Sequence, residues 1–124
     1  PKSLPSLVMA SRMQDKAASI GFDWKSIDGV KDKIKEELNE LEHEINHGTK
    51  EKITDEFGDV FFSLVNYARF LKINPDDALS STNRRFRSRF EAMEKIAKQQ
   101  GYELVSLTPK QWEQLWQAAK KKYT

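Results

Sequence analysis

Five carboxylates occur at spacings that would gather them in one place if the surrounding segments are helical. Glu36, Glu37 and Glu40 form the pattern E-E-x-x-E, and Glu56 and Asp59 form E-x-x-D after a short gap. Residues three apart on a helix are neighbours, with Cβ atoms about 5–6 Å apart, so Glu37 pairs with Glu40 and Glu56 with Asp59. Four like charges that meet across two antiparallel helices need a cation between them, and oxygen ligands favour Mg²⁺ or Mn²⁺.

The alternative to a metal site is an ordinary solvated acidic face. Glu is common on helix surfaces, and lysines are interleaved with these carboxylates at Lys31, Lys33, Lys35 and Lys52. Two observations favour the metal site. The second carboxylate pair borders a strongly apolar segment, and a basic segment follows downstream.

The basic segment offers side chains that suit phosphate. Arg85 and Arg89 are four residues apart and share a helix face, as do Trp116 and Lys120 further along. Two arginines with a lysine are common partners of phosphate oxygens, and the indole could stack on a nucleobase. Each feature also has an ordinary explanation, because arginine runs are usually solvated and tryptophans usually pack in a core.

The charges are segregated along the chain. There are 21 basic and 19 acidic residues, and the net charge of +2 argues for neither a nucleic acid polymer nor a membrane as partner. Residues 31–60 carry five basic and ten acidic side chains, whereas residues 84–124 carry ten basic and four acidic ones. The two blocks either neutralise each other across a helix interface or converge on a ligand that needs both, such as a metal ion with a polyphosphate.

The sequence also contains a zinc-binding motif. His43, Glu44 and His47 spell H-E-x-x-H, which in zinc proteases places two imidazoles on the metal and makes the Glu a general base. The chain has two histidines in all, and Gly48 should end the helix directly after the second. We therefore prefer exposed histidines at a helix C-terminus, where they suit the helix dipole, over a zinc metallohydrolase.

Composition excludes several classes of protein. The 124 residues contain no cysteine, which removes disulfide, thiolate and cysteine-ligated zinc chemistry, and the length fits one domain. No apolar stretch approaches the roughly 18 residues of a membrane span, and no signal-peptide pattern is visible, so we expect a cytoplasmic protein without a membrane partner. Pro1 fits a chain trimmed of its initiator Met and equally a fragment of a longer protein.

Apolar spacing predicts helices almost everywhere and no strand. The connections at Gly48 and Asn74 are short enough for antiparallel neighbours. The predicted fold is therefore all-α, a bundle of four to five helices. The expected helices cover residues 4–20, residues 26 or 28 to 48, residues 53–71, residues 75–100 after an N-cap at Asn74, and a segment from Thr108 to about Lys121 that opens on a capping box with Gln111.

The helix predicted for residues 53–71 is more apolar than a small bundle requires. Phe62 and Phe70 fall outside its main apolar stripe, so apolar side chains cover much of its circumference. A chain of this size cannot easily surround such a helix, and we expect it to lie in a homodimer interface. A single bundle is the alternative.

Several long segments resemble one known family. E-E-L-N-E-L-E-H-E-I at residues 36–45 and the segments at residues 55–71 and 74–90 are similar to the MazG nucleoside triphosphate pyrophosphohydrolases. Residues 4–24 look like the lead-in to the C-terminal, catalytic domain of the two-domain bacterial members, and the resemblance continues through W-E-Q-L-W-Q-A-A-K near the end. The carboxylate pattern is weak alone but specific within this much matching sequence.

The resemblance implies an all-α, dimeric enzyme whose single domain spans residues 1–124 and would be the C-terminal part of a longer chain. It also implies Mg²⁺-dependent hydrolysis of NTPs and dNTPs to the monophosphate and pyrophosphate, a reaction that serves housecleaning of the nucleotide pool. Carried over by position, the metal ligands would be Glu37, Glu40, Glu56 and Asp59, with Glu36 alongside. The phosphate- and nucleotide-contacting positions would be Arg85, Arg89, Trp116 and Lys120, with Lys33 and Lys52 as weaker candidates.

Two hypotheses of different classes follow. In the first, water attacks the α-phosphorus of a metal-bound triphosphate, and Glu36, or whichever carboxylate is left off the metal, is the general base. In the second, the chain is a non-catalytic helical dimerisation module whose acidic and basic faces recognise a partner protein. Release of pyrophosphate from a dNTP separates the two.

Overall fold

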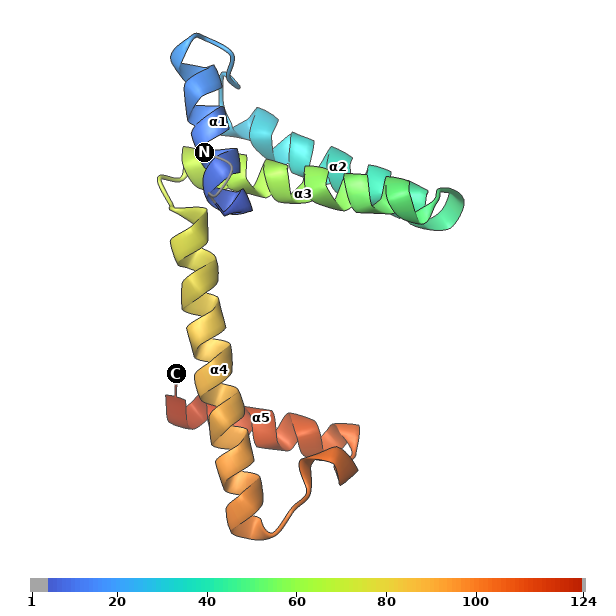
Figure 1. Cartoon of the computed structure of the whole chain (residues 1–124), viewed down its shortest axis with the longest axis vertical. Coiled ribbons are helices and arrows are strands. Elements are labelled where there is room, and N and C mark those ends of the chain that lie inside the picture. Colours follow the sequence, from blue (N-terminus) through green and yellow to red (C-terminus); the bar gives the residue numbers. More distant parts are fainter. Residues whose placement is uncertain (1–4, 124) are drawn as a thin grey trace. The chain divides into compact units, whose positions relative to one another are not determined.

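The structure, a computed structural model, describes residues 5–123 (Figure 1). Within that range the chain forms five α-helices and no strand, which confirms the all-α prediction. The predicted start of the first helix, at residue 4, lies outside the described residues. No helix in this range is both long and apolar enough to cross a bilayer. The elements are α1 (Ser6–Ser19), α2 (Ile27–His47), α3 (Lys50–Phe70), α4 (Pro75–Gln100), a 3₁₀ turn η1 (Leu104–Ser106) and α5 (Pro109–Tyr123).

The helices begin where the sequence provides caps. The N-cap of α2 is Ser26, one of the two predicted starts. Asn74 caps α4 as expected, because its Oδ1 accepts a hydrogen bond from the Asp76 N–H at 3.0 Å. α3 begins three residues earlier than predicted, since the Thr49 hydroxyl accepts from the Lys52 N–H at 3.3 Å.

The predicted capping box opens α5. The Thr108 N–H donates to Gln111 Oε1 at 2.8 Å, and the Gln111 N–H donates back to Thr108 Oγ1 at 3.3 Å. Two backbone donors of the first turn are thereby paired by reciprocal bonds. The 3₁₀ turn just before this cap has no counterpart in the sequence prediction.

Three helices end on a residue in the left-handed region. Gly21 after α1 and Gly101 after α4 have φ of 96° and 77°, which a glycine adopts without strain. Both stops agree with the sequence prediction. After α3 the corresponding residue is Lys72 with φ of 61°, and the next N–H, that of Ile73, donates to the Ala68 carbonyl at 2.9 Å.

The chain divides into two compact units, one up to Asp76 and one from Asp77 onward. In the first unit α2 and α3 lie antiparallel, joined at Gly48 and Thr49, and α1 packs on α3 (Figure 1). The antiparallel pair predicted around Gly48 is thus confirmed. The buried apolar residues of this unit are Val30, Leu41, Val60 and Val65.

The second unit has its own small core between the C-terminal part of α4 and α5. Its buried residues are mostly small, which lets the two helices approach closely. Larger side chains from α4, α5 and the connection between them complete the cluster. The buried members are Ala92, Met93, Ala97, Leu115 and Ala119, and Ile96, Leu104, Leu107, Trp112 and Trp116 pack against them.

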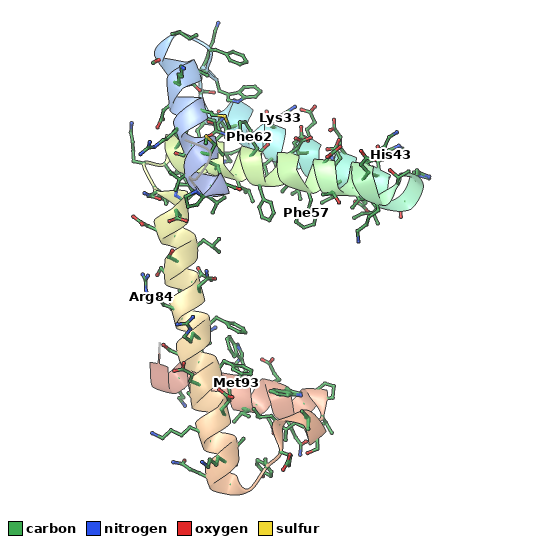
Figure 2. The ribbon with its side chains drawn as sticks, in the orientation of Figure 1. Lys33, His43, Phe57, Phe62, Arg84 and Met93 are labelled. Atoms are coloured by element: carbon green, nitrogen blue, oxygen red, sulfur yellow. The ribbon has the colours of Figure 1, made fainter. Side chains whose placement is uncertain are left out.

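Much of the apolar stripe on α3 remains exposed in a single chain. Val60 is buried, but Phe57, Phe61 and Leu64 keep 48%, 53% and 44% of their surface accessible. The rings of Phe57 and Phe61 contact each other with centroids 5.4 Å apart. Figure 2 shows Phe57 projecting from the α2–α3 pair. The helix therefore presents an apolar face that α1 and α2 do not cover.

Candidate metal site

The predicted carboxylates meet between α2 and α3. Oxygen atoms of Glu36, Glu37 and Glu40 lie within 4.8 Å of one another, and so do oxygens of Glu37, Glu56 and Asp59. Glu37 belongs to both groups and therefore joins the two helices. Figure 2 shows Lys33 and His43 on the same helix, on either side of this acidic stretch.

Two buried oxygens in the cluster have no hydrogen-bond partner. Glu37 is only 5% exposed, and its Oε2 has no hydrogen-bond partner; the same holds for the buried Oε2 of Glu56. A buried carboxylate oxygen without a partner is costly, whereas a divalent cation would satisfy both oxygens at once. The donor set of carboxylate oxygens alone fits Mg²⁺ or Mn²⁺ better than a softer metal.

The electrostatics agree with a missing positive charge. Burial of its carboxyl, followed by the negative charge of Glu40 and the contact with Glu37, raises the pKa of Glu56 from 4.5 to about 7. The charge of Asp59 adds to the effect. Without a cation the cluster therefore resists full ionisation at neutral pH, and a bound cation would remove that resistance.

Lys33 lies next to the cluster. Its Nζ is 3.0 Å from Glu37 Oε1 and 3.4 Å from Glu36 Oε1, and the hydrogen bond to Glu37 is the main cause of the raised pKa of Lys33. Lys33 thus holds one oxygen of Glu37 while the other points into the cluster. Lys52, the second lysine among the predicted substrate contacts, is exposed in the first turn of α3.

The predicted phosphate contacts lie in the second unit, where two of them touch. The Arg89 guanidinium lies over the Trp116 ring at 5.5 Å, and the same ring contacts Phe86 at 5.7 Å. The Nε of Arg89 is buried without a hydrogen-bond partner. Arg85 donates to Ser81 and Thr82 one turn back on α4, and Lys120 is exposed on α5.

The H-E-x-x-H motif does not form a three-ligand site. The rings of His43 and His47 lie 4.8 Å apart at the exposed end of α2. The described part of the chain has two groups of three potential ligands, and both consist of the carboxylates. No third ligand joins the histidines there, which agrees with the preference for exposed histidines.

A cavity beside the cluster was not found from the sequence. It has a volume of about 420 Å³ and lies between α1, the α1–α2 connection and α3. The sequence offered only a weak signal, a glutamine at position 14 of the first helix, seven residues before the G-F-D-W stretch. The cavity is lined by Met13, Gln14, Ala17, Phe22, Asp23, Trp24, Phe62, Asn66 and Arg69.

A smaller cavity of about 160 Å³ is lined in part by the same residues. It shares Trp24, Phe62 and Asn66 with the larger cavity and is also lined by Lys33. Lys33 in turn contacts Glu37. Phe62 and Asn66 of the shared lining lie on α3, the helix that carries Glu56 and Asp59.

A family comparison covers this whole carboxylate site. The family model of the MazG nucleotide pyrophosphohydrolase domain matches residues 25–94. This range includes the five carboxylates of the cluster as well as Arg85 and Arg89. The chain belongs to this family. The MazG match extends over more than half of the chain and confirms the resemblance drawn from the sequence.

Individual MazG relatives match nearly the whole chain. A protein of Thermotoga maritima called nucleoside triphosphate pyrophosphohydrolase/pyrophosphatase MazG is 40% identical over 117 residues, covering 94% of this chain and 45% of the relative. The nucleoside triphosphate pyrophosphohydrolase of Escherichia coli K12 is 35% identical over 123 residues, covering 98% of this chain and 47% of the relative. The chain thus spans about half the length of these relatives.

Proposed function

We propose that this MazG chain hydrolyses nucleoside triphosphates, both NTPs and dNTPs, to the monophosphate and pyrophosphate. The main support for this proposal is a pair of buried carboxylate oxygens, one on Glu37 and one on Glu56. They come from two different helices, and neither has a hydrogen-bond partner. The names of the relatives in Thermotoga maritima and Escherichia coli describe the same reaction. Removal of unwanted triphosphates from the nucleotide pool would be its role.

The carboxylates would hold the metal that this reaction needs. Glu37, Glu40, Glu56 and Asp59 supply oxygens from both helices, and Mg²⁺, or Mn²⁺ in its place, is the ion that suits them. When bound, the ion would neutralise triphosphate charge and make a coordinated water more acidic. Lys33 contacts Glu37 and Glu36 and would help to keep them in place, and it stays a weaker candidate for a phosphate contact.

Glu36 is the proposed general base. Its exposed carboxylate stands at the edge of the cluster, where it can take a proton from the attacking water. The water oxygen bonds to the α-phosphorus as the bond from that phosphorus to the bridging oxygen breaks, and pyrophosphate leaves. Arg85, Arg89 and Lys120 stay the phosphate contacts that the family resemblance implies, since their cationic side chains suit phosphate oxygens.

Two places are candidates for the nucleobase, the Trp116 ring and the aromatic cavity. One face of the Trp116 ring carries Arg89, so we assign Trp116 to positioning this guanidinium rather than to stacking on a base. The aromatic cavity is the place we assign to the nucleoside, because its apolar and aromatic walls suit a base and its Phe62 and Asn66 lie on the same helix as Glu56 and Asp59. Lys52 remains a weaker candidate for a phosphate contact.

The proposal is tested by product analysis with two carboxylate variants. The wild type, given a dNTP panel and Mg²⁺, should release monophosphate and pyrophosphate. Glu56→Gln and Asp59→Asn should lower kcat by at least about a hundredfold, because each removes a ligand charge while keeping the side-chain shape. Mg²⁺ should also raise the thermal unfolding midpoint of the wild type but not of these variants.

Glu42→Gln is the matched control, since Glu42 is an exposed glutamate on α2 outside the cluster. It should keep both activity and the Mg²⁺ effect. Release of diphosphate and phosphate would contradict attack at the α-phosphorus. Absence of turnover with every nucleotide would instead favour the non-catalytic dimerisation module.

A further inference from the structure

Gln14 has an amide that is only half satisfied. Its Nε2 donates to the main-chain carbonyl of Phe62 at 3.0 Å, whereas its Oε1 is buried without a hydrogen-bond partner. The residue as a whole is 7% exposed and lines the larger cavity. Because the Nε2 bond fixes which end of the amide is which, the atom left without any partner is the acceptor Oε1.

The rest of the cavity suits a flat, uncharged ligand. Its walls are mainly apolar and aromatic, including Trp24 and Phe62. The two charged groups in the wall, Asp23 and Arg69, form an ion pair with each other. The Arg69 guanidinium also donates a second hydrogen bond, from its Nε to Asn66 Oδ1 at 3.0 Å. A charged ligand would therefore find no unpaired countercharge in this wall.

The cavity also lies at a suitable distance from the carboxylates for one nucleotide to reach both. Asn66 follows Asp59 by seven residues on α3, which is about 10 Å along the helix axis. Phe62 lies between them, one turn from Asp59. A base in the cavity would thus leave its phosphates on the side of the metal site.

We infer that Gln14 Oε1 accepts a hydrogen bond from an N–H group of the nucleobase and makes that donor a requirement for efficient turnover. The inference rests on the proposed function. Bases with an amino or imide N–H on their pairing edge satisfy the buried oxygen. A base without such a donor leaves Gln14 Oε1 without a hydrogen-bond partner in an apolar wall. The cost of that unpaired oxygen should lower kcat/KM for such a nucleotide.

Paired substrates that differ only in this donor test the inference. CTP is compared with the triphosphate of 2-pyrimidinone riboside, and ATP with the triphosphate of purine riboside, which lack the amino group. The wild type should favour CTP and ATP by about 10- to 100-fold in kcat/KM. Gln14→Met, similar in length but without polar amide atoms, should reduce both preferences below about twofold, through loss on CTP and ATP.

Gln99→Met is the matched control, because Gln99 is exposed on α4; it should keep the wild-type preferences. Preferences that survive in Gln14→Met would overturn the role of Gln14 while the pyrophosphohydrolase activity stands. Should the wild type hydrolyse none of the four nucleotides, the proposed function fails, and the inference is then decided by binding alone.

Binding is followed in the wild type without any substitution. The side-chain amide resonances of Gln14 in a ¹⁵N-labelled chain should shift on addition of CMP, and much less with the monophosphate of 2-pyrimidinone riboside. This readout needs neither turnover nor a variant that folds. Equal shifts with both nucleotides, or none, would overturn the inference.

Discussion

At the scale of single residues, spacing predicted which carboxylates gather but not how they are linked. The i, i+3 pairs were visible from the sequence, since Glu56 and Asp59 need only one helix to meet. Which residue joins the helices depends on their packing, and there Glu37 takes the central place. The contact of Lys33 with Glu37 is an i, i+4 pair on one helix, so its spacing was readable from the sequence, whereas the cavity around Gln14 forms between separate segments.

The ion pair of Asp23 and Arg69 gives a pH-dependent prediction. The hydrogen bond from Arg69 holds the pKa of Asp23 below its ordinary value of 3.8. A lowered carboxyl pKa means that the folded state binds fewer protons, so the stabilisation is present above pH 3.8 and is lost as the pH falls through the folded pKa. Asp23→Asn should therefore lower the free energy of unfolding by about 0.5–1 kcal/mol at pH 7.

Urea unfolding of the wild type and Asp23→Asn across a pH series measures this difference. The gap between the two proteins should shrink as the pH falls below 3.8 and close only below the lowered, folded-state pKa of Asp23, because the carboxyl is then protonated in the folded wild type as well. A gap of the same size at acid and neutral pH would show that Asp23 acts by shape and not by charge.

At the scale of elements, boundaries were predictable where a cap has a chemical signature. Thr108 with Gln111, and Asn74 before Pro75, marked two helix starts correctly because side-chain oxygens near the backbone determine them. The start of α3 was missed, since Thr49 precedes a polar first turn that carries no apolar periodicity. Glycine predicted the left-handed ends of α1 and α4, but a lysine at such a position gives no signal.

Lys72 at the end of α3 is therefore a site where a substitution should stabilise the chain. A side chain with φ of 61° suffers a steric clash of its Cβ that glycine lacks. Lys72→Gly should raise the free energy of unfolding by about 0.5–1 kcal/mol, the relief of strain exceeding the entropy cost of glycine.

The same substitution in a helix interior should have the opposite sign. Lys95 is exposed within α4, and Lys95→Gly should lower the free energy of unfolding by about 1 kcal/mol. Denaturant unfolding of both variants provides the comparison. Destabilisation by Lys72→Gly would mean that the lysine side chain contributes more than the strain costs.

At the scale of the whole molecule, the spacing of apolar residues predicted the all-α class. It did not predict which faces of each helix are buried. Apolar spacing on α3 correctly predicted a helix, and Val60 on that stripe is buried. The division into two compact units at Asp76 was not predicted, because the helical pattern runs continuously through α4. The excess of apolar residues over one small core was readable from the sequence, and the exposed face of α3 agrees with it.

That face leads to a prediction about the oligomer. With Phe57, Phe61 and Leu64 each about half exposed, a second copy of this chain is the partner we propose, since two such faces can bury one another. Light scattering after gel filtration should give the mass of two chains for the wild type and of one chain for Phe61→Lys, because a lysine ammonium cannot be buried there without a countercharge. Val105→Lys, at a residue 91% exposed in the other unit, should remain dimeric. A wild type with the mass of one chain would contradict the dimer. A dimeric Phe61→Lys would show that the dimer interface lies elsewhere.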